Sequence, residues 1–267
     1  MNILDISWFH LSLGTVFIII ALGVSLYESL KIESQILIGS LRATVQLIFV
    51  GYLIQIIFDL NEWYIVLIIL VVMVLVASQT LIKRLKQPIT GTYVYALIAV
   101  SIASVLSVIL LTRVVIQIDP WYDPRYLIPL SGMIIANGMN GASLAGERFK
   151  SEMEHRLPEM EMLLSLGYDS RRASEKPRQQ ALIAGLIPSL NNLMVMGIVS
   201  LPGMMTGQII AGSSPVTAVK YQIIIVISIL ATVSLTSWIL ITLLEKRLFT
   251  PHHQIRYDLI GSKKKGS

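Results

Sequence analysis

Cysteine is absent from this chain, and charged side chains make up only 14% of its 267 residues. The lack of cysteine excludes disulfide bonds, thiolate metal sites and a cysteine nucleophile. Hydrophobic residues make up 54% of the sequence. So large an apolar share with so few charges lies outside the range of soluble globular domains. The composition therefore predicts a membrane protein.

Apolar runs recur along the whole chain. A helix needs about 20 residues to span the hydrocarbon core of a bilayer. Seven segments come near that length: 8–27, 36–58, 63–82, 92–111, 127–145, 181–201 and 219–244. The fifth and sixth are rich in Gly, Asn, Ser and Pro, which is typical of membrane helices that face protein or a cavity. We therefore expect an all-α, polytopic membrane protein with about seven transmembrane helices, forming a single domain over residues 1–267.

The positions of the basic residues indicate an orientation. If the amino terminus lies outside, 17 of the 21 Lys and Arg residues fall on the inner side. Only Arg113, Arg125 and Lys220 then fall outside, in agreement with the positive-inside rule. The tail, about 245–267, would be cytoplasmic, and its three lysines at 263–265 would anchor it to anionic lipid rather than bind nucleic acid. We expect a multi-pass protein of the cell membrane, which is the cytoplasmic membrane in a bacterium.

Polar side chains at membrane depth are costly unless they face partners, water or a substrate, so they mark candidate functional sites. Arg42 and Gln46 lie four residues apart in the second span, on one face of the expected helix. Arg42 could line a transport path, or it could snorkel to the inner interface or pair with Glu28 or Glu33. The sequence leaves these alternatives open.

The fifth span carries Asn137 and Asn140 beside small residues at Gly138, Ala142 and Gly146. Residues spaced by four share one helix face, so the small stripe predicts close packing against another helix. The two asparagines could hydrogen-bond between helices, or they could line a cargo path.

The sixth span carries a second pair of amides, Asn191 and Asn192, followed by Met194 and Met196. Amide oxygens and thioether sulfurs could line a path for a transition metal or a metal complex. Methionines also fill gaps in helical cores, so the identity of any metal ligand stays unknown. Two copies meeting at a dimer axis would bring the asparagines of the fifth and sixth spans into one cavity.

A charged stretch, about 147–180, interrupts the apolar sequence on the expected cytoplasmic side. Pro158 and Glu159 predict the start of a short helix, since proline and acidic residues suit a first helical turn. Gly167 is a suitable stop for this helix, and Asp169 or Ser170 can cap the next one.

The polar residues of this short helix are acidic at Glu159 and Glu161, whereas a helix that lies on a lipid surface should carry basic ones. The helix therefore indicates a docking element for a cytosolic protein. We expect Met160, Leu163 and Leu164 to fill a groove of that partner.

Several segments resemble FetB-type permeases, the membrane subunits of iron-export ABC transporters, to which plant aluminium-tolerance permeases are related. They are GSLRATVQLIFVGY (39–52), IPLSGMIIANGM (128–139), LSLG (164–167) and VSLPGMMTGQIIAGSSPVTAVKYQI (199–223). The segment EMLLSLG, with Glu161 six residues before Gly167, also resembles the loop by which bacterial ABC-importer permeases insert a coupling helix into their ATPase. The usual Leu-Pro spacing downstream of that loop is not kept.

The resemblance implies a permease homodimer bound to two copies of a separately encoded ABC ATPase, because the Walker sequence GxxxxGK[ST] is absent here. The partner would bind ATP and Mg²⁺, and this chain would hold no cofactor and would not be an enzyme. Transport by alternating access would move iron or another metal out of the cytoplasm.

The sequence leaves two alternatives open. Plant relatives are linked to nucleotide-sugar transport, so a nucleotide sugar or another small anion is the alternative cargo. A seven-helix receptor or an intramembrane enzyme belongs to a different class. The sequence lacks paired intramembrane carboxylates and an HExxH motif, which disfavours an enzyme.

Overall fold

The computed structural model describes residues 7–60, 62–85 and 91–260, and over these ranges its regular elements are helices. The expected all-α class is confirmed. The chain divides into two compact units, one made of residues 1–62 with 210–212, the other of residues 63–209 and 213–267.

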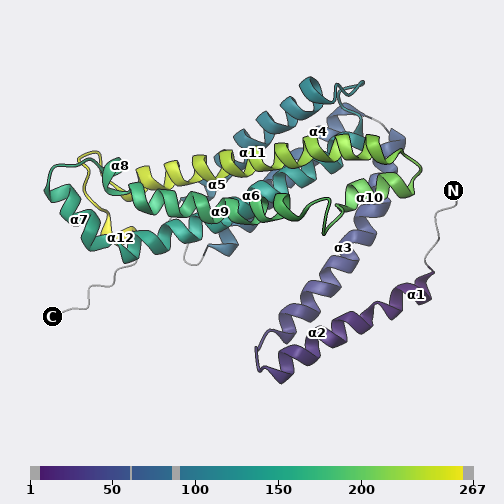
Figure 1. Cartoon of the computed structure of the whole chain (residues 1–267), viewed down its shortest axis with the longest axis horizontal. Helices are drawn as coiled ribbons and strands as arrows, with labels where there is room; N and C mark the ends of the chain where they lie inside the picture. The colour runs from purple at the N-terminus through teal and green to yellow at the C-terminus, as the bar shows by residue number, and fades with distance from the viewer. Residues whose placement is uncertain (1–6, 61, 86–90, 261–267) are drawn as a thin grey trace. The chain divides into compact units, whose positions relative to one another are not determined.

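The first unit contains α1 (Trp8–Leu13), α2 (Thr15–Tyr27) and α3 (Glu33–Leu60), and Gly14 separates α1 from α2. A tight turn reverses the chain between α2 and α3, so that the two helices form a hairpin (Figure 1). Ser25 Oγ donates a hydrogen bond of 2.8 Å to Glu33 Oε1 across this turn. Most apolar side chains of the hairpin are exposed, as suits helices that lie in a bilayer.

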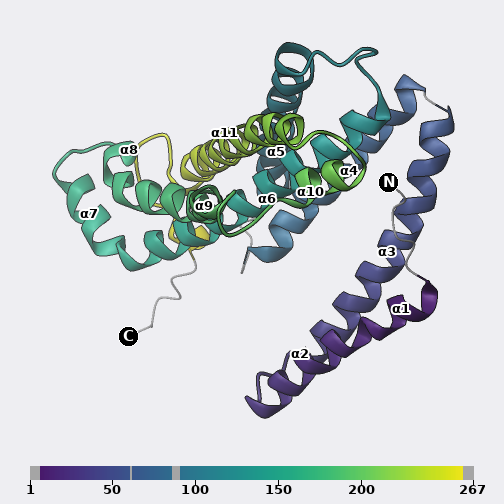
Figure 2. The same cartoon turned by 45° about the vertical axis from the view of Figure 1, so that its right-hand side comes forward.

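The second unit is a bundle built around one long helix, α6 (Pro124–His155). The longer helices that pack against α6 are α4 (Trp63–Arg84), α5 (Thr92–Ile109), α9 (Glu175–Val195) and α11 (Pro215–Leu248). α5 continues as a π-helix, η1 (Leu110–Val115). Figures 1 and 2 both show α9 and α11 running along α6 for much of its length.

Glycines allow this close approach. A Cβ on Gly138 would lie 2.9 Å from Thr236 Oγ1, and a Cβ on Gly146 would lie 2.9 Å from Leu85 Cδ2. The small stripe on α6 therefore packs against other helices, as predicted. A second contact was not predicted: a Cβ on Gly185 of α9 would lie 2.7 Å from the Gly141 carbonyl oxygen of α6.

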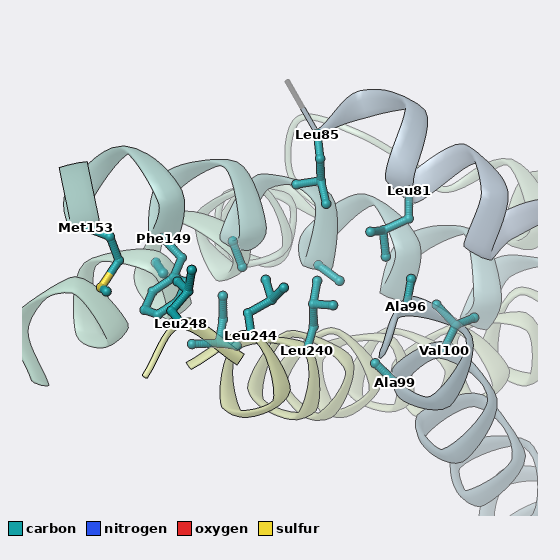
Figure 3. Packing of buried hydrophobic residues seen from close by; sticks show 14 of the residues in the cluster. Leu81, Leu85, Ala96, Ala99, Val100, Phe149, Met153, Leu240, Leu244 and Leu248 are labelled. Carbon is teal, nitrogen blue, oxygen red and sulfur yellow. The ribbon is translucent and has the colours of Figure 1, made fainter. Parts of the chain in front are cut away.

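The buried apolar core runs along the bundle from the α5 contact to the end of α11 (Figure 3). Figure 3 labels side chains from α4, α5, α6 and α11, together with Leu85 directly after α4, that form it: Leu81, Leu85, Ala96, Ala99, Val100, Phe149, Met153, Leu240, Leu244 and Leu248. Because it continues beyond residue 145 of α6, the core supports the segment that follows the predicted fifth span.

Five helical stretches of the described chain are long and apolar enough to cross a membrane: Trp8–Tyr27, Glu33–Leu60, Trp63–Arg84, Thr92–Val115 and Pro215–Leu248. They correspond to five of the seven predicted spans. The fifth and sixth predicted spans fall in α6 and α9, whose Asn, Gly, Ser and charged residues lower their hydropathy. Seven spans and the orientation therefore stay predictions.

Two predicted boundaries differ from the structure. α6 continues to His155, so the first part of the 147–180 stretch is helix rather than loop. α9 ends at Val195 and not at 201, because residues 196–200 form a tight turn closed by a bridge between Met196 and Ser200. Pro202 and the short helix α10 (Gly203–Ile210) follow.

Candidate functional site

A short helix projects at one end of the second unit (Figure 1). This helix, α7 (Leu157–Ser165), carries Pro158 in its first turn. Gly167 follows it with a φ of +87°, a left-handed conformation that favours glycine. Asp169 caps α8 (Ser170–Ala173), because its side chain accepts a hydrogen bond of 2.8 Å from the Arg172 backbone N–H. The predicted helix, its glycine stop and the cap that follows are confirmed.

The docking role expected for Met160 of α7 is wrong. Met160 is buried with 1% of its surface exposed, and Leu163 and Leu164 pack against the core of this chain. Residues at i, i+3 and i+4 share a helix face, and the chain uses that face to hold α7 on the bundle. The exposed apolar residues are instead Met162 and Leu166, at 57% and 69%.

Ion pairs fix the start of α7. Arg156 contacts Glu152 of α6 at 2.7 Å and Glu159 of α7 at 3.0 Å, and Lys176 of α9 donates a further hydrogen bond to Glu159. Hydrogen bonds from Lys176 and then from Arg156 lower the pKa of the Glu159 carboxyl below its ordinary value, because they favour its charged form. Glu159 therefore links α7 directly to α9 and, through Arg156, to α6.

A buried ion pair ties α9 to the end of α11. Arg178 lies 3.3 Å from Glu245, with side chains exposed by only 13% and 9%. Ser174 donates a hydrogen bond of 3.0 Å to the other oxygen of Glu245. Buried charges are tolerated only when paired and hydrogen-bonded in this way, so this pair sets the position of the α8–α9 segment.

The chain that follows α11, residues 249–260, lies beside α7 and is called the strap below. A bridge between Phe249 and Ile255 closes a hairpin, and α12 (Tyr257–Ile260) follows it. Tyr257 donates a hydrogen bond of 2.6 Å to Glu161, which raises the pKa of the Tyr257 hydroxyl. His253 Nδ1 accepts a hydrogen bond of 3.2 Å from the Ser170 N–H.

A groove of about 830 Å³ lies between α7 and this strap, and Glu161, Tyr168, His253 and Tyr257 are among its lining residues. Sequence reasoning treated residues 245–267 as a simple tail and missed the strap. No spacing signal pairs Tyr257 with Glu161, which precedes it by 96 positions.

The asparagines of α6 lie in different surroundings. Asn137 is half-buried and donates to the Met133 carbonyl oxygen of its own helix at 2.8 Å. Asn140 is exposed and accepts a hydrogen bond from Arg84 at the end of α4. Arg84 was not among the predicted site residues, although its position near the end of an apolar run was visible in the sequence.

The two asparagines of α9 lie near its carboxyl end. Asn191 and Asn192 are both exposed, and Met194 is 79% exposed. Met196 lies beyond the end of the helix, and Gln222 of α11 donates to its sulfur at 4.0 Å. The structure therefore places the two methionines in separate surroundings.

Arg42 and Gln46 lie in α3 of the first unit and are exposed. Glu33, one of the expected partners of Arg42, accepts its hydrogen bond from Ser25. Among the described residues, no group of three or more His, Cys, Asp or Glu side chains could hold a metal ion.

These features define a class: an all-helical, multi-pass membrane protein with a braced helical element at one end of its bundle. The family model described as "Uncharacterised protein family (UPF0014)" matches residues 8–249. The chain belongs to the UPF0014 family.

Relatives of known name match nearly the whole chain. The UPF0014 membrane protein YjkA of Bacillus subtilis is 36% identical, over 94% of this chain and 99% of that protein. The "Probable iron export permease protein FetB" of Escherichia coli is 32% identical, over 96% and 97%. Protein ALUMINUM SENSITIVE 3 of Arabidopsis thaliana is 28% identical, over 92% and 89%. No solved structure matches the chain.

Proposed function

We propose that this chain is the membrane subunit of an ATP-driven exporter, and that α7 docks with a separate ABC ATPase. In this proposal seven helical segments cross the membrane, and the α7 end faces the cytoplasm. Two copies of the chain form the permease and bind two ATPase subunits. Iron or another metal is the cargo, in keeping with the name of the Escherichia coli relative.

One observation carries the docking proposal. α7 is held to the bundle by Met160, Leu163 and Leu164, yet it leaves Met162 and Leu166 exposed. Apolar anchors on a rigid element are the usual centre of a protein interface. Because polar contacts at Arg156, Glu159 and Glu161 tie the first half of α7 to α6, α9 and the strap, movement of a docked partner would be passed to those elements.

The cargo path is proposed along α6 and α9, which contact each other and carry the four asparagines. The described residues hold no cluster of strong metal ligands. Weak amide ligands suit an exporter, because a cargo held too tightly would not be released.

A nucleotide sugar or another small anion is the second candidate cargo. The observation in its favour is Arg84, which places a permanent positive charge beside Asn140 on the proposed path. Vesicles that contain permease and ATPase can be offered radiolabelled iron and radiolabelled nucleotide sugar in parallel. Metal transport supports the first candidate, and transport of the sugar alone would replace it with the second.

The docking proposal is tested by co-expressing the chain with the ABC ATPase of its own transport system and purifying the permease. Changing both Met162 and Leu166 to aspartate should reduce ATPase recovery at least tenfold while the permease stays folded. His155→Asp adds a carboxylate at an exposed position outside α7 and should leave recovery unchanged. Full recovery with the α7 variant would refute docking through this face.

A further inference from the structure

A second polar pocket lies where α11 leaves its apolar run. Its volume is about 530 Å³, and three of its lining side chains are cationic: Lys246, Arg247 and Arg256. No Asp or Glu is among its described lining residues. Arg256 also lies 3.8 Å from the carboxylate of Asp258, which is largely exposed. The pocket therefore carries net positive charge.

One hydrogen-bond donor of Arg247 lacks a partner. Its Nε is buried and has no hydrogen-bond partner among the described residues. A buried donor without a partner costs free energy, and a guanidinium presents its donors in a fork that matches the oxygens of a phosphate group. The pocket is thus suited to an anion that supplies acceptor oxygens.

The walls of the pocket place it at the edge of the bilayer. Tyr95 lies one turn into α5, and Leu243 lies near the end of α11. Both helices are candidate membrane spans, so the pocket joins the two at one end. Tyrosine and basic residues are enriched at this depth, where lipid headgroups lie.

We propose that this pocket binds the phosphate of an anionic phospholipid, with its acyl chains on the apolar walls formed by residues such as Leu243. A free phosphate shares the headgroup chemistry, but it offers nothing to the apolar side of the pocket. The site would stabilise the junction between α11 and the strap, because Arg256 belongs to the strap and Arg247 to the helix.

The test uses the purified full chain in neutral detergent, with phosphatidylglycerol and phosphatidylcholine as probes. Native mass spectrometry should show at least tenfold tighter binding of phosphatidylglycerol. The triple variant K246Q/R247Q/R256Q should lose this preference. Arg171→Gln removes one exposed charge outside the pocket and should keep it. An unchanged preference in the triple variant would overturn the proposal.

Two further measurements test the lipid site without the triple variant. Arg247→Gln alone retains most of the aliphatic stem, and it should weaken phosphatidylglycerol binding at least threefold if the triple variant does not fold. Inorganic phosphate should fail to displace the lipid at millimolar concentration. Displacement at concentrations near the lipid's own Kd would show a site for soluble phosphate and would overturn the lipid assignment.

Discussion

The two ends of the α6 bundle are built differently. At the α7 end, Glu152, Glu159, Glu161 and Glu245 each have a polar partner, and the strap packs beside them. At the other end, the turn after α9 exposes Ile198 by 90% and Val199 by 79%. One end is braced by specific polar contacts, whereas the other presents apolar surface that suits lipid or another chain.

This difference indicates that the two ends have different mechanical roles. Polar contacts fix distance and direction, so a braced end can transmit a displacement. An end with few such ties can change its packing at lower cost. The proposed ATPase contact lies at the braced end, where substitutions can test whether the polar contacts matter.

The largest effect is expected at the buried pair. Glu245→Gln leaves Arg178 as an uncompensated buried charge and should lower the free energy of unfolding by about 3 kcal/mol. The matched control is Glu175→Gln, which breaks an exposed pair with Arg172 and should cost less than about 1 kcal/mol. Denaturation in mixed micelles measures both losses of stability. Equal losses would show that burial does not make the Arg178 pair more important for stability than an exposed pair.

The second-largest loss of stability is expected in the middle of the bundle. Gly185→Ala places a Cβ 2.7 Å from a backbone oxygen of α6, which forces the helices apart and should cost about 1–3 kcal/mol. Gly23→Ala in α2 meets nothing within 4 Å and should be neutral or slightly stabilising, because alanine favours helices. A neutral result at residue 185 would contradict the close approach of α6 and α9.

The strap should show a smaller and more local effect. Tyr257→Phe removes the hydrogen bond to Glu161, worth about 1 kcal/mol at this partly exposed site. Hydrogen exchange should speed up in residues 248–260 and at the end of α7. Tyr168→Phe, at an exposed tyrosine beside the same groove, should leave exchange unchanged.

The smallest effect concerns pH. The pKa of Glu159 is lower in the folded chain than its ordinary value of 4.5. Its contribution to stability is therefore present above that value and is lost as pH falls through the folded pKa. Limited proteolysis near α7 should increase as the pH falls below the ordinary value of 4.5, and Glu159→Gln should reduce this change. A variant with the wild-type pH response would show that Glu159 does not cause the pH dependence of α7.

Local rules predicted much of this molecule. The apolar runs indicated the helices, and Pro158, Gly167 and Asp169 marked the start, stop and next cap around α7 because these signals act over a few residues. The burial of Met160 against its own chain was not predicted, since an apolar stripe does not reveal whether it meets its own chain or a partner. Arg178 and Glu245 are 67 positions apart, so only the fold could pair them.

The sequence predicted which helices carry the candidate cargo path, but not the contacts of their polar side chains. The asparagines of α6 and α9 lie on helices that pack together, but the hydrogen bond from Arg84 to Asn140 depends on how α4 meets α6. The end of α9 at Val195 was missed because the apolar run continues past it. Composition alone does not show a turn in such a run.

The proposed contact of α7 with an ATPase through Met162 and Leu166 can be tested directly, because the chain has no cysteine. A single cysteine at position 162, treated with a short thiol-to-amine crosslinker, should join the permease to the co-expressed ATPase. A cysteine at position 194, exposed on α9, should give no such product. Crosslinking from position 194 with none from position 162 would contradict the account.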